Sequence, residues 1–429
     1  MIRRLLGASA DHHSTTGRSV ALALAACVAL LAGACSSMES ASSSSQRPPA
    51  PAGTAPAALA QPAYASALRP KLQQIFTDTL TPGAVVLVRS PELGDWTATF
   101  GTRALGGADP VTLADHVRVG SNTKTWTGTV ILQLVQEGNL TLDDPVSTYR
   151  PDVPNGQNIT IAELLNMRSG LYNYTESLEL NQTLDTNPTK VWTPDELLAI
   201  AYKNPPYFPP GQGFHYSNTN TVLLGLIIEK LTGHPVEQEF QRRIFTPLGL
   251  RNTHLPPRTS NALPAPFPSG YQFGTNVETM TTQVLPPDQQ AAARAGILKP
   301  LDATHDNPSW AWTAGSGIST AEDLAHYAQA LVGGGLLTDA MQKQRLASIR
   351  PIDPADPKSP GYGLALSQFG PVFGHTGELP GYNSFMGHDP RRSITIIVWS
   401  SLAAAPDGRA PAVEMAKAII GHLHAGQVP

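Results

Sequence analysis

The amino-acid sequence predicts a mixed α/β fold of the α+β type, in which one antiparallel sheet is flanked by helices and an all-helical lobe is inserted. Apolar strand patterns occur near both ends of the globular part of the chain, at 83–102 and at 362–400. Helical patterns occupy most of the chain between these regions. Because a sheet must bury its apolar faces against other elements, strands from both ends are expected to form one helix-covered sheet.

The first predicted elements are a helix and two strands. Residues 65–76 have a helical pattern, and the continuous apolar run over 83–88 is typical of a strand buried on both faces. A second strand, over 96–102, follows across a turn. This part of the chain therefore begins the predicted sheet.

Helices dominate the middle of the chain. Residues 121–137 carry an apolar stripe at helical spacing, and Gly138 ends that helix. Loops and helices fill 139–300, including a helix over 221–231. A further helix is predicted over 320–332.

The end of the chain returns to strands, which are predicted over 362–367, 371–376, 382–387 and 393–400. A final amphipathic helix covers 410–423.

These elements place 65–429 in one domain with two lobes. The α/β lobe covers about 65–125 and 300–429, and the helical lobe covers about 126–299.

The composition excludes several classes of protein. Of the 429 residues only 14% are charged, where about 25% is usual, and the net charge of −4 gives no basic footprint for nucleic acid. Both cysteines precede residue 36, and no two histidines are spaced four residues apart. We therefore expect no metal, no cofactor and no nucleic-acid partner, and a monomeric domain.

The first 34 residues have the design of a signal peptide. An apolar run over 19–34 is preceded by Arg3, Arg4 and Arg18, and it is shorter than the roughly 20 residues of a membrane-spanning helix. We therefore expect the protein to be exported.

Cys35 follows Ala32-Gly33-Ala34 and resembles the cysteine of a bacterial lipobox, which becomes lipidated. Cys27, after Leu24-Ala25-Ala26, is the alternative, although it would leave only half an apolar segment. Residues 35–64 are rich in Ser, Pro and Ala, as in a flexible tether. We expect a lipoprotein that is held at the outer side of the cell membrane by its lipid alone; the simpler alternative is a secreted protein with an incidental cysteine.

The first chemical motif is Ser121-Asn122-Thr123-Lys124. A serine at a helix N-terminus lies near free backbone N–H groups, and a lysine one turn later lies on the same face. That lysine can accept the serine proton if burial or a nearby positive charge keeps it neutral. Taken alone, the motif is equally an N-cap serine followed by a surface lysine.

The second motif is Tyr216-Ser217-Asn218, which lies in a Gly/Pro-rich loop just before a helix. A tyrosine can act as a base when a cation such as Lys124 lowers its pKa, and an asparagine can hold a substrate carbonyl or a lysine amine. The simpler interpretation is a turn whose asparagine caps the next helix.

The third motif is His375-Thr376-Gly377 at the end of a predicted strand. The glycine permits close approach of another backbone, and His375 and Thr376 would supply side-chain donors to a substrate added along the strand edge. A lone histidine before a turn is the simpler interpretation.

In this order the three motifs resemble the serine penicillin-recognising enzymes, whose signature is Ser-x-x-Lys, then Tyr-x-Asn, then Lys/His-Thr-Gly. The likeness covers nearly all of 65–429 and is greatest to the secreted D-alanyl-D-alanine carboxypeptidases of the class C-like branch. The stretches that carry it include SNTKTWTGTVILQLVQEGNL, MRSGLYNYT, YSNTNTVLLGLIIEKLTG and GYGLALSQFGPVFGHTGELPGY. The resemblance implies a β-lactamase/transpeptidase-like fold.

The resemblance also implies a role for each motif residue. Ser121 would be the acylated nucleophile, Lys124 and Tyr216 would transfer protons, and Asn218 would position the substrate amide. His375, Thr376 and Gly377 would line the opposite wall, and Trp310 would lie beside the pocket unless it is a core aromatic. The backbone N–H groups of Ser121 and Glu378 would form the oxyanion hole.

One departure concerns the substrate. These carboxypeptidases place an arginine shortly after the GYGL strand to bind the terminal carboxylate of D-Ala, whereas Ser367 stands at about that point here. We expect an extracytoplasmic serine hydrolase, D-alanyl-D-alanine carboxypeptidase-like and acting on cell-wall peptides. The alternatives are a β-lactamase or an esterase/amidase of the same fold. The expected partner is therefore a small-molecule substrate: a small peptide, a β-lactam or an ester. A non-catalytic lipoprotein that binds cell-wall peptide is the alternative outside enzymes.

Overall fold

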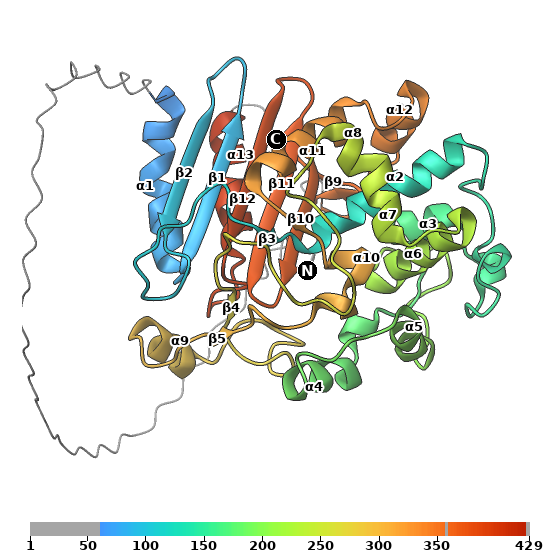
Figure 1. The fold of residues 1–429 in the computed structure, drawn as a ribbon, viewed down its shortest axis with the longest axis horizontal. Helices are drawn as coiled ribbons and strands as arrows, with labels where there is room; N and C mark the ends of the chain where they lie inside the picture. The colour runs from blue at the N-terminus through green and yellow to red at the C-terminus, as the bar shows by residue number, and fades with distance from the viewer. Residues whose placement is uncertain (1–60, 357–358, 426–429) are drawn as a thin grey trace, which may run out of the picture. The chain divides into compact units, whose positions relative to one another are not determined.

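Eight antiparallel strands form one sheet in the order β2-β1-β12-β11-β10-β9-β8-β7 in the computed structural model, which describes residues 61–356 and 359–425. The strands at both ends of the described chain therefore lie side by side (Figure 1), and the predicted fold class is confirmed. The strands are β1 (Gly83–Arg89), β2 (Trp96–Gly101), β7 (Arg350–Pro351), β8 (Gly361–Tyr362), β9 (Ser367–Phe369), β10 (Val372–Leu379), β11 (Tyr382–Asp389) and β12 (Ile394–Ser400).

Both faces of the sheet are buried, which explains the continuous apolar run in β1. Val85 and Leu87 point into the larger apolar cluster, whereas Val86 and Val88 point into a second cluster on the opposite face. This alternation follows from the two-residue period of a strand. The helix α1 (Ala63–Asp78) and the C-terminal helix α13 (Pro411–Leu423) complete the second cluster.

The larger cluster contains the helices that carry the chemistry. The helix α2 (Thr123–Gln136) contributes Trp126, Val130 and Leu134, the stripe that its spacing predicts, and α11 (Ala321–Gly333) packs against β11 and β12. Burial of the whole α2 stripe holds the first turn of this helix at a fixed position beside the sheet.

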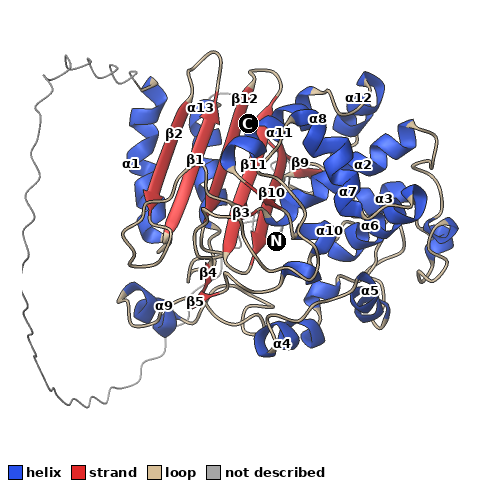
Figure 2. Cartoon of the chain, in the orientation of Figure 1, coloured by secondary structure: helices blue, strands red, loops and turns tan. Residues whose placement is uncertain are grey.

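Most of the remaining helices gather beyond the β9 end of the sheet (Figure 2). They are α3 (Ile161–Leu165), α4 (Leu178–Thr186), α5 (Pro194–Tyr202), α6 (Asn218–Thr232), α7 (Val236–Phe240), the π-helical η6 (Gln241–Phe245), α8 (Thr246–Leu248), α10 (Trp312–Gly315) and α12 (Asp339–Ala347). The helix α9 (Pro287–Arg294) lies apart from this group in the view of Figure 2. Short 3₁₀ turns η2 (Gly120–Asn122), η3 (Val146–Thr148), η4 (Gly156–Asn158), η5 (Tyr174–Glu176) and η7 (Pro308–Trp310) connect them.

The inserted region is not wholly helical. β4 (Tyr271–Gln272) pairs with β5 (Leu301–Asp302), and β3 (Val117–Arg118) pairs with β6 (Ile318–Ser319). The described residues, 61–356 and 359–425, nevertheless belong to one compact unit. The division of that unit into two lobes at about 125 and 300 stays a prediction.

The strand predicted over 362–367 is wrong. The chain turns there between β8 and β9: the Gly363 N–H donates to the Leu366 carbonyl, and Ala365 has φ of +52°. The Ala365 N–H donates instead to Leu165, far away in the sequence. A tertiary contact therefore interrupts what the apolar pattern presents as one strand.

The predicted signal peptide, Cys35 and Cys27 lie outside the described residues, and so does the tether up to residue 60. Among the residues that the structure describes, no helix combines the length and the apolar character that crossing a membrane requires.

Candidate active site

Ser121 lies in the tight turn η2 that leads into α2, directly against strand β10. Gly120 makes this approach possible: its φ is +56°, and a side chain on it would bring a Cβ to 2.4 Å from the backbone nitrogen of Glu378. Gly377 meets the turn from the other side, where a Cβ would lie 1.9 Å from the Val119 carbonyl oxygen. Two glycines therefore let the first and third motifs touch, because neither position tolerates a side chain.

Lys124 is the centre of the site. Its side chain is fully buried, and its Nζ lies 3.1 Å from Ser121 Oγ, 2.5 Å from Asn218 Oδ1 and 2.7 Å from the Ala314 carbonyl oxygen. No carboxylate of the described residues forms an ion pair with it. Burial lowers the pKa of Lys124 well below its usual value, because a charged amine loses its hydration there.

The two carbonyl oxygens determine how a neutral Lys124 is oriented. A neutral amine has two N–H donors and one lone pair. If Asn218 Oδ1 and Ala314 O accept the two N–H groups, the lone pair is left for the Ser121 hydroxyl. The arrangement is that of a serine nucleophile beside its general base.

Asn218 is held in this orientation by residues that the sequence analysis did not single out. Its Nδ2 donates to Thr175 Oγ1 at 3.1 Å, and its backbone N–H donates to Asn173 Oδ1 at 3.0 Å. Because Nδ2 has its own acceptor, Oδ1 must face Lys124. Asn173 and Thr175 lie in the stretch MRSGLYNYT. Their polar side chains after a Gly-Leu pair are the sequence feature that could have indicated a role in the site.

Tyr216 lies over the same amine, with its ring centroid 4.7 Å from Lys124 Nζ. Its hydroxyl is buried near Ser121 Oγ, but the two do not meet the geometry of a hydrogen bond. Burial chiefly raises the pKa of Tyr216 well above its usual value, with a smaller contribution from Tyr362, and the facing Ser121 hydroxyl opposes this rise. The expectation that a charged Lys124 lowers this pKa is therefore wrong, since burial favours the neutral forms of both side chains.

His375 also differs from its expected role as a donor to substrate. Its Nδ1 lies 2.6 Å from the Thr376 carbonyl oxygen, which accepts only, and its Nε2 lies 3.2 Å from the Tyr362 hydroxyl. Burial lowers the pKa of His375 to about 3. The ring is therefore neutral with both nitrogens engaged, and Tyr362 is a supporting residue that the sequence analysis missed.

Thr376, Gly377 and Glu378 follow along β10. The Thr376 side-chain hydroxyl makes no hydrogen bond with another described residue, and its role as a donor to substrate stays a prediction. The Glu378 backbone nitrogen lies next to Gly120 and hence beside Ser121. This placement agrees with an oxyanion hole formed by the N–H groups of Ser121 and Glu378, which stays a prediction.

Trp310 lies at the edge of the larger cluster, partly exposed. Its carbonyl oxygen accepts a hydrogen bond of 2.6 Å from the hydroxyl of Tyr174, a buried residue between Asn173 and Thr175. The side chain borders both core and solvent, so its place in the pocket stays a prediction.

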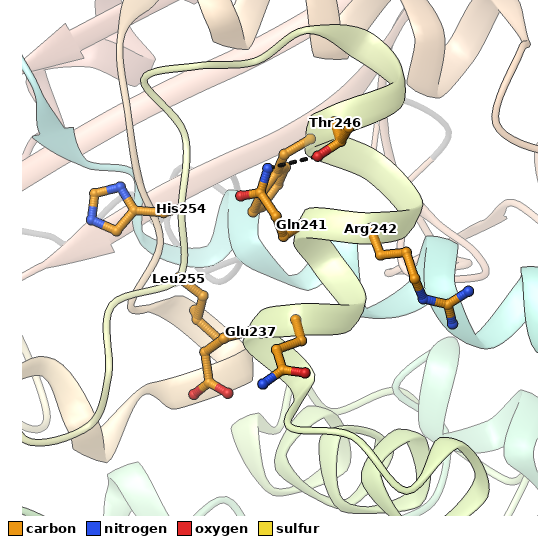
Figure 3. Close-up of a pocket in the computed structure, with 8 residues that line it drawn as sticks. Glu237, Gln241, Arg242, Thr246, His254 and Leu255 are labelled. Carbon is orange, nitrogen blue, oxygen red and sulfur yellow. Dashed lines mark hydrogen bonds between the residues drawn. The ribbon is translucent and has the colours of Figure 1, made fainter.

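An open groove elsewhere on the domain contains none of these residues. Figure 3 shows it along α7 and the π-helical turn η6, opposite His254 and Leu255. It is lined by Glu237, Gln238, Gln241, Arg242, Phe245, Thr246, His254 and Leu255. Within the described ranges no three His, Cys, Asp or Glu side chains are grouped as a metal site.

Comparison with known proteins identifies the fold and its relatives. The beta-lactamase family model matches residues 71–419. A D-stereospecific amidohydrolase from Streptomyces is 32% identical, with a TM-score of 0.68 over 83% of this chain and 98% of that one. An esterase of Burkholderia gladioli is 27% identical over 73% of this chain and 87% of its own length.

A putative penicillin-binding protein of Bacillus subtilis is 28% identical over 66% of this chain. The match covers 61% of that relative, and it covers 61% of another B. subtilis penicillin-binding protein. The chain therefore spans about three-fifths of these two relatives.

Proposed function

The chain belongs to the beta-lactamase family of serine hydrolases, as its three motifs predict, and we propose that it hydrolyses D-aminoacyl amide and peptide bonds through an acyl-enzyme on Ser121. The observation that carries the proposal is the buried Lys124, whose two N–H groups have carbonyl acceptors and whose lone pair is left for Ser121.

Acylation begins when Ser121 Oγ attacks the scissile carbonyl carbon and its proton passes to Lys124 Nζ. The oxyanion that forms is stabilised by the backbone N–H groups of Ser121 and Glu378. The proton then passes through the Tyr216 hydroxyl to the leaving nitrogen, the C–N bond breaks and the amine departs. The neutral pair of Lys124 and Tyr216 can carry this proton without ionising Tyr216 first.

Deacylation repeats these steps with water in place of the serine. Lys124 accepts a proton from the water as the water attacks the ester carbonyl, with Tyr216 able to relay it, and Ser121 Oγ leaves with that proton. The product is a free carboxylic acid, and the enzyme returns to its starting state.

The chain offers little to bind a carboxylate on the leaving group. Ser367 is buried in β9 between Tyr362 of β8 and Gly374 of β10, and it supplies no positive charge. The neutral His375 supplies none either. A leaving group without a carboxylate, such as ammonia or an arylamine, suits this wall, and the relative named as a D-stereospecific amidohydrolase supports the choice.

D-alanyl-D-alanine carboxypeptidase activity is the second candidate. It is favoured by the relatives named as penicillin-binding proteins. The same site chemistry would serve, but a cation outside this wall would have to bind the terminal carboxylate. We also propose that the enzyme is exported and anchored through Cys35, so that cell-wall peptides are within its reach.

Covalent labelling tests the acyl-enzyme. An activated-serine probe or a fluorescent penicillin should label the wild type, whereas Ser121→Ala should not be labelled although its thermal transition is unchanged. Ser359→Ala, a substitution in an outer loop, is the matched control and should be labelled like the wild type. Equal labelling of Ser121→Ala would refute the mechanism, and a wild type without any labelling would favour a non-catalytic binding protein.

A turnover panel then identifies the substrate. D-Alanine amide, a D-Ala-D-Ala peptide, a chromogenic cephalosporin and a short-chain aryl ester should be compared by kcat/KM. The proposal requires the amide to exceed the D-Ala-D-Ala peptide. Release of D-Ala from the peptide at the higher rate would make the carboxypeptidase the function.

A further inference from the structure

Asn383 is a buried polar residue of β11 that lies outside the three motifs. It stands opposite Glu378 of β10 in the strand register, and the helix α13 packs against its strand. Its side-chain Nδ2 donates to the Gly377 carbonyl oxygen at 3.1 Å, and its Oδ1 accepts from the backbone N–H groups of Ala412 at 3.0 Å and Val413 at 3.3 Å. One amide group therefore joins the wall of the site to the start of α13.

The orientation of this amide is determined by its partners. Backbone N–H groups only donate and a carbonyl oxygen only accepts, so the amide cannot be turned over. Ala412 and Val413 lie in the first turn of α13, where N–H groups lack partners within a helix, and the preceding Ala410 offers no side-chain cap. Asn383 therefore caps α13 from a strand and leaves its Nδ2 facing the third motif.

The bond from Asn383 Nδ2 fixes the direction of a neighbouring N–H group. The Gly377 carbonyl and the Glu378 N–H belong to one planar peptide unit and point in opposite directions. A glycine restricts the rotation of such a unit least, and no larger residue fits here, since a Cβ on Gly377 would lie 1.9 Å from the Val119 carbonyl oxygen. Asn383 supplies the missing restraint at the carbonyl end of the unit.

The helix α13 also strengthens this bond. Its 13 residues place a positive partial charge at the N-terminal end, next to Asn383 Oδ1. Hydrogen bonds in a chain polarise one another, so two N–H groups bound to Oδ1 make Nδ2 a better donor to Gly377. The polarised peptide unit in turn makes the Glu378 N–H a better donor.

We propose that Asn383 is a positioning residue of the oxyanion hole, an assignment that rests on the proposed function. It acts through the peptide unit between Gly377 and Glu378, and it does not touch the reacting atoms. Acylation and deacylation both pass through an oxyanion, so loss of the Nδ2 donor slows both steps. kcat therefore falls while KM stays unchanged, because the ratio of the two steps is preserved.

Two substitutions of Asn383 separate its cap from its donor. Asn383→Asp keeps an oxygen for α13 and removes the donor to Gly377, whereas Asn383→Ala removes both. Asn383→Asp should therefore retain a urea midpoint closer to that of the wild type. In both variants, kcat for the best substrate of the turnover panel and the rate of labelling by the activated-serine probe should fall about 10-fold or more, with KM unchanged.

Ile419→Val is the matched control, since it trims a buried side chain of α13 that belongs to the apolar cluster. It should lower the urea midpoint and leave kcat unchanged. Wild-type kcat in Asn383→Asp would overturn the inference, as would a kcat that follows the urea midpoint across the three variants. A labelled wild type with Asn383→Asp labelled at the same rate refutes this inference alone, whereas a wild type that is not labelled refutes the proposed function.

Discussion

Replacing Lys124 by methionine should change catalysis and the pH dependence of stability together. In the native protein, burial lowers the pKa of Lys124 well below its usual value, whereas in the unfolded chain it returns to about 10.4. Between these two values the unfolded state binds one more proton than the folded state. The free energy of unfolding therefore rises with pH in this interval, and the stabilisation is complete only above about pH 10.4.

The magnitude follows from that one proton. Within the interval, the contribution of Lys124 to the unfolding free energy changes by about 1.4 kcal/mol per pH unit. Methionine cannot titrate, so Lys124→Met should remove this slope between about pH 8 and pH 10. It also leaves the Ala314 carbonyl and Asn218 Oδ1 without their donor, which costs about 1–3 kcal/mol for each acceptor at any pH.

Urea denaturation at several pH values measures the difference in unfolding free energy between wild type and variant. The contributions of all other titrating groups cancel in this difference. Loss of the general base should lower kcat/KM by about 10²–10⁴-fold. The wild-type kcat/KM should fall on the acid side as Lys124 becomes protonated. Identical slopes of stability against pH in the two proteins would refute a neutral buried Lys124.

Two further substitutions test other parts of the site. Tyr216→Phe removes a buried hydroxyl that lacks a partner among the described residues. It should therefore raise the unfolding free energy by up to about 1–2 kcal/mol, while kcat falls about 10²-fold or more. Denaturant titration and a turnover assay check both effects, and a destabilised variant would contradict the buried, unpaired hydroxyl. Gly120→Ala places a Cβ 2.4 Å from the Glu378 nitrogen at a φ of +56°, so it should lose probe labelling and at least about 1 kcal/mol of stability. The control Gly106→Ala, which has positive φ but open space around it, should lose stability alone. Labelling of Gly120→Ala at the wild-type rate would show that β10 does not need to approach Ser121.

The fold could be predicted from the sequence wherever the signal is local. The apolar run of β1 and the stripe of α2 report burial on both faces of a strand and on one side of a helix. The strand over 362–367 could not be predicted correctly. Its pattern is apolar, yet the Ala365 N–H bonds to Leu165 and the chain turns, and this contact has no counterpart in the local sequence.

The site shows the same division. Ser121 and Lys124 are three residues apart, so helical geometry alone brings them to one face. The acceptors that orient Lys124 come from Asn218 and from the Ala314 carbonyl, 94 and 190 residues further along the chain. A backbone carbonyl has no sequence signature because every residue carries one.

The sequence by itself determined the family, the fold class and the order in which the chemical groups of the site occur, because local patterns and short motifs carry this information. Only the tertiary structure decided which side chains are neutral and which atoms they face. Protonation depends on burial, and orientation depends on partners from distant segments. Tyr216 and His375 illustrate the difference: both were found from their motifs, yet burial raises the pKa of one and lowers the pKa of the other, which gives them roles that the motifs do not contain.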